Sequence, residues 1–423
     1  MSAIQANGLT KIFGRRPQRG VRMLEEGADR AKLRKEGLTA AVIDATFDVE
    51  PGEIFVVMGL SGSGKSTLIR TVNGLLEPTA GSISIDGQDV THLSKAGLRE
   101  VRRTKVSMVF QHFALLPHRT VGENAAYPLQ LRGVNKAERE QRAEEALGMV
   151  GLAGWGGSLP SELSGGMRQR VGLARALAAG TDVLLMDEAF SALDPLIRKE
   201  MQDQLLELQS ELGKTILFIT HDLNEAMRLG DRIAMMRDGR IVQVGTAEQI
   251  LNEPANDYVA QFVADVDRSR VLTASAVMER PAAVIGVESG PKAAHKLLRE
   301  HQVPALIVTG RNRRLEGVVW EDDVANAVKQ GADKLPLSDE GAIRVTPDTP
   351  LIEILGDAAS SRAPLAVVDE NGRLLGVIPR VTLLSALSMP DGENGATGDE
   401  PAAPAAAPGG DGDTVLDPAG ANR

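Results

Sequence analysis

The chain has 423 residues, 43% hydrophobic and 25% charged, which is ordinary for a soluble protein and long enough for two or three domains. It contains no cysteine, which excludes disulfides, thiolate metal sites and a cysteine nucleophile. The formal net charge of −10 argues against a nucleic-acid-binding protein that works by bulk electrostatics, so no nucleic-acid partner is expected.

The longest apolar runs, such as IFVVMGL at 54–60, are far shorter than the roughly 20 apolar residues of a membrane span. The first residues, MSAIQANGLTKIFG, have no apolar secretory core. We therefore expect a cytoplasmic protein that works at a membrane only through a partner.

Residues 1–13 and 40–58 are expected to form short strands. Between them, residues 14–38 are polar, with eight Lys or Arg and four Asp or Glu, and we predict an insertion that is at most partly helical. From about 59 to 245, strand-like runs such as VLLMDE and TILFIT alternate with helix-like stretches. This alternation predicts an α/β domain with a mostly parallel sheet.

After about residue 268 the pattern changes to an internal repeat. Residues 303–328 match 363–387, with Gly317 aligned to Gly376 after a one-residue gap. Each copy is expected to form a strand, a polar turn, a strand and a helix. Two such copies usually pack as one regulatory unit, because neither buries its apolar face alone.

From Met389 onward the composition is mainly Gly, Ala, Pro and acidic residues, with seven Asp or Glu and one Arg, which gives −6 of the total −10. Such a segment cannot bury enough apolar surface to offset its ordering entropy. We predict a disordered acidic tail at 389–423.

GLSGSGKST at 59–67 fits the phosphate-loop pattern G-x-x-x-x-G-K-[ST], after an expected strand and before an expected helix. Its glycines let backbone N–H groups surround the β- and γ-phosphates at a helix N-terminus. Lys65 adds a charge to the phosphates, and the Ser66 hydroxyl suits Mg²⁺. The expected nucleotide-binding residues are Gly59, Ser61, Gly62, Ser63, Gly64, Lys65, Ser66 and Thr67.

Two further motifs point to phosphate chemistry. VLLMDE at 183–188 ends in Asp187, suited to hold Mg²⁺, and Glu188, suited to accept a proton from the attacking water. In LSGGMRQR, Ser164 and two glycines begin a helix, a second anion site, and the second glycine is unexplained unless a phosphate comes close. Because two such helix ends cannot easily grip one γ-phosphate in a monomer, we predict a head-to-tail dimer.

The order phosphate loop, Gln111, LSGGMRQ, VLLMDE, SALD and His221 resembles the ATP-binding-cassette (ABC) ATPases over residues 1 to about 250. The resemblance implies that Gln111 senses Mg²⁺ and water and links to the membrane partner. It assigns Ser164, Gly165 and Gly166 to the γ-phosphate of the opposite subunit's nucleotide, and Asp194 to coupling between the two sites. His221 would hold the γ-phosphate and position the water.

The family also stacks adenine on an aromatic residue upstream of the phosphate loop. Phe13 in TKIFG is the natural candidate, although residues 14–38 separate it from the loop. Stacking on a base is worth roughly 1–3 kcal/mol and tolerates any aromatic ring. A Phe that only fills the core is the alternative.

The insertion, the Met167–Arg168 variant of the signature, and the C-terminal repeat resemble the ATPase subunit of glycine betaine/proline-type osmoprotectant importers. The repeat resembles a tandem of cystathionine-β-synthase-type (CBS) modules. The implied fold is an α/β P-loop NTPase of ABC-ATPase type, with a RecA-like core and a helical subdomain, followed by an α+β tandem CBS pair. The implied domains are 1–267 (ATPase), 268–331 and 332–388 (CBS modules) and the tail.

This resemblance implies an ATPase that uses ATP and Mg²⁺, a homodimer at the cytoplasmic face of the plasma (inner) membrane. Its partners would be integral-membrane permease subunits and, indirectly, a substrate-binding protein, and its task the uptake of betaine- or choline-type osmolytes. The CBS pair would sense ionic strength. The basic stretches 30–35 and 99–105 would attract the acidic tail or anionic lipid, and this attraction would weaken as the salt concentration rises. Solvated tail and helix faces without such a role are the alternative.

CBS modules that bind adenine nucleotides usually show a hydroxyl residue and an aspartate after the second strand. The first copy has Trp320 and Asp323 at these positions, and the second has Pro379 and Thr382. This departure favours an electrostatic or structural role over nucleotide binding.

Other functions are less consistent with these residues. An importer for another solute, such as an amino acid, is disfavoured by the insertion and the CBS pair. Soluble ABC proteins of DNA repair or translation usually carry two cassettes or a long coiled coil, and neither is present. A regulatory module with a vestigial ATPase is disfavoured by intact Glu188, Gln111 and His221.

Overall fold

The computed structural model describes residues 1–111, 114–191, 193–264, 266–338 and 342–387. The acidic tail lies outside the described residues, so its disorder stays a prediction. In the part of the chain that is described, no helix has the length and apolar character needed to cross a bilayer.

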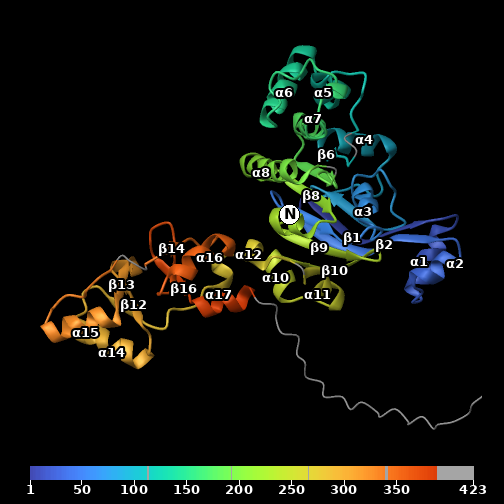
Figure 1. Cartoon of the computed structure of the whole chain (residues 1–423). Helices are drawn as coiled ribbons and strands as arrows, with labels where there is room; N and C mark the ends of the chain where they lie inside the picture. Colours follow the sequence, from blue (N-terminus) through green and yellow to red (C-terminus); the bar gives the residue numbers. More distant parts are fainter. Residues whose placement is uncertain (112–113, 192, 265, 339–341, 388–423) are drawn as a thin grey trace, which may run out of the picture. The chain divides into compact units, whose positions relative to one another are not determined.

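A six-stranded sheet lies at the centre of the N-terminal part (Figure 1), in the order β10 (Arg240–Gly245), β9 (Arg232–Arg237), β3 (Ile54–Met58), β8 (Thr215–Thr220), β7 (Val183–Asp187) and β6 (Val106–Val109). All neighbours are parallel except the antiparallel pair β10–β9. Every residue of β3 is buried, because Val56 packs into one apolar cluster and Phe55 and Val57 into another. The predicted α/β class with a mostly parallel sheet is confirmed.

A second, antiparallel sheet has the order β2 (Thr39–Val49), β1 (Ile4–Phe13), β4 (Ala80–Ile85) and β5 (Gln88–Asp89). The segment between β1 and β2 forms two helices, α1 (Pro17–Glu25) and α2 (Arg30–Lys35). Leu33 is fully buried against Ile12 and Leu38. The expected insertion is thus partly helical, as predicted, and the burial of Leu33 comes from tertiary packing that the polar sequence does not display.

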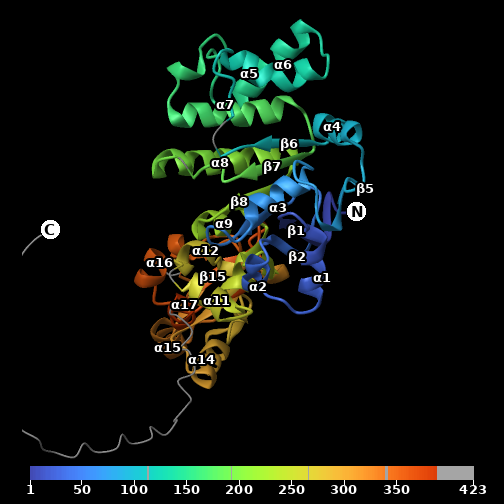
Figure 2. The same cartoon turned by 90° about the vertical axis from the view of Figure 1, so that its right-hand side faces the viewer.

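The remaining helices of this part connect the strands or follow the last strand, β10. Helices α5 (Val121–Leu131), α6 (Lys136–Met149) and α7 (Gly165–Ala178) pack on one another as a helical subdomain, visible together in Figure 2. The others are α3 (Lys65–Val72), α4 (Lys95–Thr104), the 3₁₀ turn Pro160–Glu162, α8 (Pro195–Leu212), α9 (Leu223–Leu229), α10 (Ala247–Asn252) and α11 (Asp257–Val263). Two short helices, α12 (Arg268–Val271) and α13 (Ala274–Val277), begin the C-terminal part and contact helices of its second repeat unit.

The C-terminal repeat consists of two small units with the same topology. The first contains β11 (Val284–Gly286), α14 (Pro291–His301), β12 (Ala305–Thr309), the 3₁₀ turn Arg311–Arg313, β13 (Leu315–Trp320) and α15 (Glu321–Gln330). The second contains β14 (Arg344–Val345), α16 (Leu351–Ser360), β15 (Leu365–Val368), β16 (Leu374–Ile378) and α17 (Arg380–Leu387). In each unit the first strand is parallel to the second, and the second is antiparallel to the third.

Each unit also receives a short segment from the chain before the other unit. Glu279 exchanges two backbone hydrogen bonds of 2.9 Å with β16, and Ser338 exchanges two, of 2.9 and 3.1 Å, with β13. A Cβ at Gly376 would lie 3.0 Å from the Glu279 carbonyl oxygen, and one at Gly317 would lie 3.1 Å from that of Ser338. The two aligned glycines of the repeat therefore make room for these crossing segments.

Candidate functional site

The loop between β3 and α3 contains two glycines at close backbone contacts. A Cβ at Gly59 (φ 151°) would lie 2.1 Å from the carbonyl oxygen of Met236. One at Gly64 (φ 108°) would lie 2.1 Å from the carbonyl oxygen of Ala41. No other residue type fits either position, and the resulting turn leads directly into the N-terminus of α3, where backbone N–H groups attract anions.

Two side chains of the loop are buried in a way that suits a phosphate. The Ser63 hydroxyl is buried without a hydrogen-bond partner among the described residues. Lys65 is 4% exposed, and its Nζ donates to the carbonyl oxygens of Gly59 (2.8 Å) and Leu60 (3.2 Å). Burial lowers the pKa of Lys65, and the two carboxylates at the end of β7 oppose this shift. Of the other predicted loop residues, Ser61 and Gly62 are exposed and Thr67 is half-buried in α3.

A pair of oxygen donors lies where β7 ends beside α3. Ser66 Oγ donates to Asp187 Oδ1 at 3.0 Å, and Asp187 is 1% exposed. Mg²⁺ prefers oxygen ligands and retains several waters, so one hydroxyl and one carboxylate beside a phosphate suit it. The described residues contain no cluster of three or more His, Asp or Glu that could hold a metal by itself. Arg70 also pairs with Asp187, at 3.4 Å, a contact that the sequence motifs did not reveal.

Two side chains from separate loops, those of Gln111 and His221, approach the carboxylate of Glu188. Gln111 Nε2 donates to Glu188 Oε2 at 3.2 Å, and His221 Nδ1 lies 3.1 Å from the same oxygen. Glu188 has a left-handed backbone (φ 48°), a conformation that costs about 1–3 kcal/mol and concentrates at functional sites. The structure thus brings together the three residues predicted to be catalytic.

The signature residues lie at the start of α7. Ser164 caps this helix by accepting a hydrogen bond from Met167 N at 3.2 Å. A Cβ at Gly166 would lie 2.8 Å from Ile197 Cγ2, whereas one at Gly165 would meet nothing within 4 Å. The second glycine therefore has a packing reason, and the expectation that only a close phosphate explains it was wrong. Gly165, by contrast, borders open space, so packing within this chain does not explain why a glycine stands there.

Two other predicted residues are exposed to solvent. Asp194 caps α8 by accepting a hydrogen bond from Ile197 N at 3.1 Å. Phe13 is 40% exposed at the end of β1, and Lys11 Nζ lies 5.2 Å from its ring centroid. The alternative of a core Phe is thus excluded, because the ring is exposed to solvent and carries the Lys11 ammonium group over it.

The repeat contains a cavity of about 510 Å³ at the start of α15, lined by Trp320, Asp322, Asp323, Ile343, Ser360, Ser361 and Arg362. Asp323, the acidic residue of the nucleotide-binding pattern, lies here. Trp320 takes up the position of the usual hydroxyl residue, as the sequence indicated.

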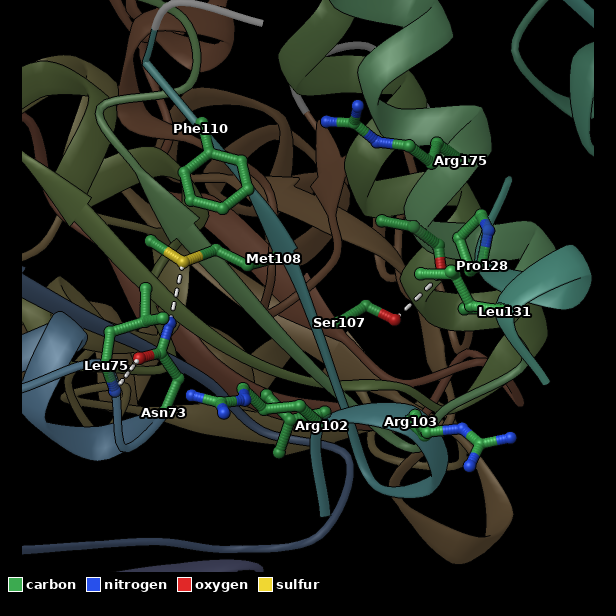
Figure 3. A pocket seen from close by; sticks show the side chains of 13 residues that line it. Asn73, Leu75, Arg102, Arg103, Ser107, Met108, Phe110, Pro128, Leu131 and Arg175 are labelled. Carbon is green, nitrogen blue, oxygen red and sulfur yellow. Dashed lines mark hydrogen bonds between the residues drawn. The ribbon is translucent and has the colours of Figure 1, made fainter. Parts of the chain in front are cut away.

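An apolar groove is lined by Phe110, the residue directly before Gln111 in the chain (Figure 3). Its cavity of about 230 Å³ is lined by residues of β6, α4, α5 and α7 and of the segments that follow α3 and β6, among them Phe110, Met108, Leu131 and Arg175. The Ser107 hydroxyl donates to Ala176 O at 3.0 Å and so ties β6 to α7 beneath the groove. The motifs in the sequence do not reveal this groove, and its only signal there is Phe110, the apolar residue directly before Gln111.

Glu225 in the first turn of α9 provides a test by pH. Glu225 is 4% exposed and accepts a hydrogen bond from Gln202 Nε2 at 3.1 Å. Burial raises the pKa of its carboxyl group, the negative charge of Asp222 raises it further, and the positive charge of Arg198 lowers it. Between the ordinary Glu pKa of about 4.3 and this raised pKa the folded state binds more protons, so stability falls as pH rises through that window.

Glu225→Gln removes this penalty while keeping an acceptor oxygen. We expect the variant to be more stable than wild type at neutral pH, with the difference shrinking toward pH 4. Urea unfolding across that pH range measures it, with the exposed Glu248→Gln as control. Parallel stability curves for wild type and Glu225→Gln would contradict the assignment.

Two family models and a solved structure match this chain. The family model described as "ABC transporter" matches residues 42–191, and that described as "CBS domain" matches 337–389. The dimeric ATP-binding cassette MJ0796, in a post-hydrolysis state bound to ADP and Pi, matches with a TM-score of 0.50 and 32% identity over 58% of this chain and 98% of its own. The fold and the site thus define an ABC ATPase with a C-terminal CBS domain.

Relatives that match nearly the whole chain identify the branch of the ABC ATPases to which it belongs. The chain is 52% identical to the glycine betaine/carnitine transport ATP-binding protein of Listeria monocytogenes, over 92% of this chain and 98% of the relative. It is 48% identical to the glycine betaine/proline betaine transport system ATP-binding protein of Escherichia coli, over 93% and 99%. The chain belongs to the glycine betaine branch of the ABC transporter ATP-binding subunits, and it is an ATP hydrolase that binds ATP.

Proposed function

We propose that this chain hydrolyses MgATP to drive uptake of glycine betaine and related quaternary amines, including choline, through an ABC importer. The observation that carries the substrate class is the similarity over nearly the whole chain, insertion and repeat included, to proteins named for glycine betaine transport. The same similarity supports integral-membrane permease partners and, indirectly, a substrate-binding protein. It supports a peripheral position at the cytoplasmic face of the inner membrane.

The phosphate loop would bind the nucleotide. Its backbone N–H groups and Lys65 bind the β- and γ-phosphates, and the Ser63 hydroxyl gains a partner there. Ser66 and Asp187 would hold Mg²⁺, with Gln111 near its water shell, and the ion when bound would neutralise charge on the phosphates. Phe13 stacks on adenine.

Glu188 would act as the general base. Gln111 and His221 both approach Oε2, so they orient the carboxylate toward the water that attacks the γ-phosphate. His221 faces Glu188 with Nδ1, so Nε2 is the nitrogen that would donate to the γ-phosphate, and the two contacts together require a proton on both ring nitrogens. The cost of the left-handed backbone at Glu188 is offset by this orientation.

Two copies would complete each site. Ser164, Gly165 and Gly166 bind the γ-phosphate of the opposite subunit's nucleotide, supported by the open face at Gly165 and the helix N-terminus behind it. Asp194, which is exposed at the start of α8, would contact the opposite subunit. The dimeric structure of MJ0796 supports this arrangement.

The apolar groove lined by Phe110 would receive a segment of the permease. It is mainly apolar, it joins the helical subdomain to the core sheet, and its floor residue Phe110 directly precedes Gln111. A partner seated there is placed to move Gln111 relative to Glu188.

We further propose that the repeat at 268–388 regulates the ATPase according to ionic strength. The basic stretches lie on α2 and α4 and attract an anionic partner less as salt rises, because the screening length falls to about 10 Å at 0.1 M. Trp320 at the hydroxyl position supports this role over nucleotide binding. An importer ATPase for an amino acid is the second candidate for the whole chain, since the ATPase subunit itself does not touch the solute.

Uptake by the native host tests the solute assignment. We expect deletion of the gene to abolish uptake of labelled glycine betaine, most strongly at raised osmolarity, and to leave proline uptake less affected. Labelled choline is compared in parallel, and a strain with the gene restored is the control. Unchanged uptake of all three solutes would contradict the osmolyte assignment and favour an amino-acid importer.

A further inference from the structure

Arg198 connects the two loops that carry Asp194 and His221. It lies in the first turn of α8, and its side chain is 28% exposed. Its Nη1 donates to Asp222 Oδ2 at 3.1 Å, and its Nη2 donates to the carbonyl oxygen of Leu193 at 3.2 Å. A single guanidinium group thus bridges the loop after β7 and the loop after β8.

Each contact lies next to a residue of the proposed site. Leu193 directly precedes Asp194, whose side chain caps α8. Asp222 directly follows His221 and caps α9 by accepting hydrogen bonds from Asn224 N (3.0 Å) and Glu225 N (3.3 Å). Arg198 therefore links the backbone next to Asp194 to the residue that follows His221.

The contacts of Arg198 favour a role in positioning the two loops over a role in stabilising the fold. Partly exposed ion pairs contribute only about 0–1 kcal/mol, whereas the planar fork of arginine fixes two acceptors at a defined separation. A second ion pair, Arg228 with Asp203, already joins α8 to α9 without touching either loop. Holding the two helices together therefore does not require Arg198.

We propose that Arg198 is a positioning residue that couples contact of the opposite subunit at Asp194 to the orientation of His221, through Asp222. This inference rests on the proposed dimeric ATPase. It predicts that losing the bridge slows hydrolysis while leaving nucleotide binding nearly intact, because Arg198 lies outside the phosphate loop.

The test compares Arg198→Met with Arg228→Met in the full-length protein. We expect Arg198→Met to lower kcat about tenfold to a hundredfold, with KM for ATP and the affinity for a fluorescent ATP analogue within about twofold of wild type. Arg228→Met, the matched control on the same two helices, keeps wild-type kcat. Arg198→Lys recovers only part of the rate, because an ammonium group cannot hold both acceptors in one plane.

A double-mutant cycle separates positioning from folding. Asp222→Asn retains the capping oxygen but loses the charge, and it should add no further loss of kcat to Arg198→Met. Additive losses of kcat in the double variant would overturn the inference, and so would equal losses of kcat in Arg198→Met and Arg228→Met. If the wild-type protein is active in the same assay, either result leaves the proposed ATPase function unaffected. A wild-type chain that hydrolyses no ATP would instead overturn the function on which the inference rests.

Discussion

Replacing Glu188 by glutamine is expected to slow ATP hydrolysis about 10²- to 10⁴-fold, the usual contribution of a general base. The amide cannot accept the proton of the attacking water, but it can still contact Gln111 and His221, which approach the carboxylate at 3.2 and 3.1 Å. ATP binding and dimer formation should persist, because neither requires that proton transfer. Steady-state hydrolysis, ATP titration and sedimentation measure the three quantities.

The control for this variant is Glu200→Gln, which alters an exposed glutamate on α8 outside the site. It should hydrolyse ATP at the wild-type rate. Near-normal turnover by Glu188→Gln would remove Glu188 from the role of base. Loss of ATP binding in that variant would show that the carboxylate shapes the phosphate loop instead.

Replacing Lys65 by methionine is expected to weaken ATP binding about ten- to hundredfold, because hydrogen bonds to charged groups contribute about 1.5–3 kcal/mol. Without nucleotide, the variant should be as stable as wild type or more so. Burial lowers the pKa of the Lys65 amine, which shows that the buried charge is unfavourable. Methionine removes this charge and retains the apolar volume of the side chain.

Thermal unfolding with and without ATP measures both effects. Wild type should gain stability with ATP concentration, and Lys65→Met should gain much less at the same concentration. Lys136→Met, at an exposed lysine of α6, is the matched control and should respond as wild type. An equal response of Lys65→Met and wild type to ATP would contradict the assignment of Lys65 to the phosphates.

The motifs could be recognised from sequence where the chemistry is local. The phosphate loop is one continuous segment between a strand and a helix, so its glycines and Lys65 were identified without tertiary information. Glu188 and Asp187 follow a buried strand, which places them at the edge where parallel strands end. Their proximity to His221 then follows from the parallel pairing of β7 and β8.

Residues whose role depends on a distant partner escaped sequence analysis. A side chain at Gly166 would crowd Ile197, which lies in another helix, and the same helix carries Arg198, whose acceptors lie in two separate loops. Leu33 is buried only because the insertion folds back on β1. The repeat glycines Gly317 and Gly376 were aligned correctly, but the segments that cross over them come from the opposite unit.

The central claim is that hydrolysis at Glu188 drives uptake of a quaternary amine. The most direct test restores either wild type or Glu188→Gln to a host that lacks the gene and measures labelled glycine betaine uptake at raised osmolarity, with equal amounts of each protein. We predict that wild type restores uptake and that Glu188→Gln does not. Equal uptake with both proteins would contradict the claim.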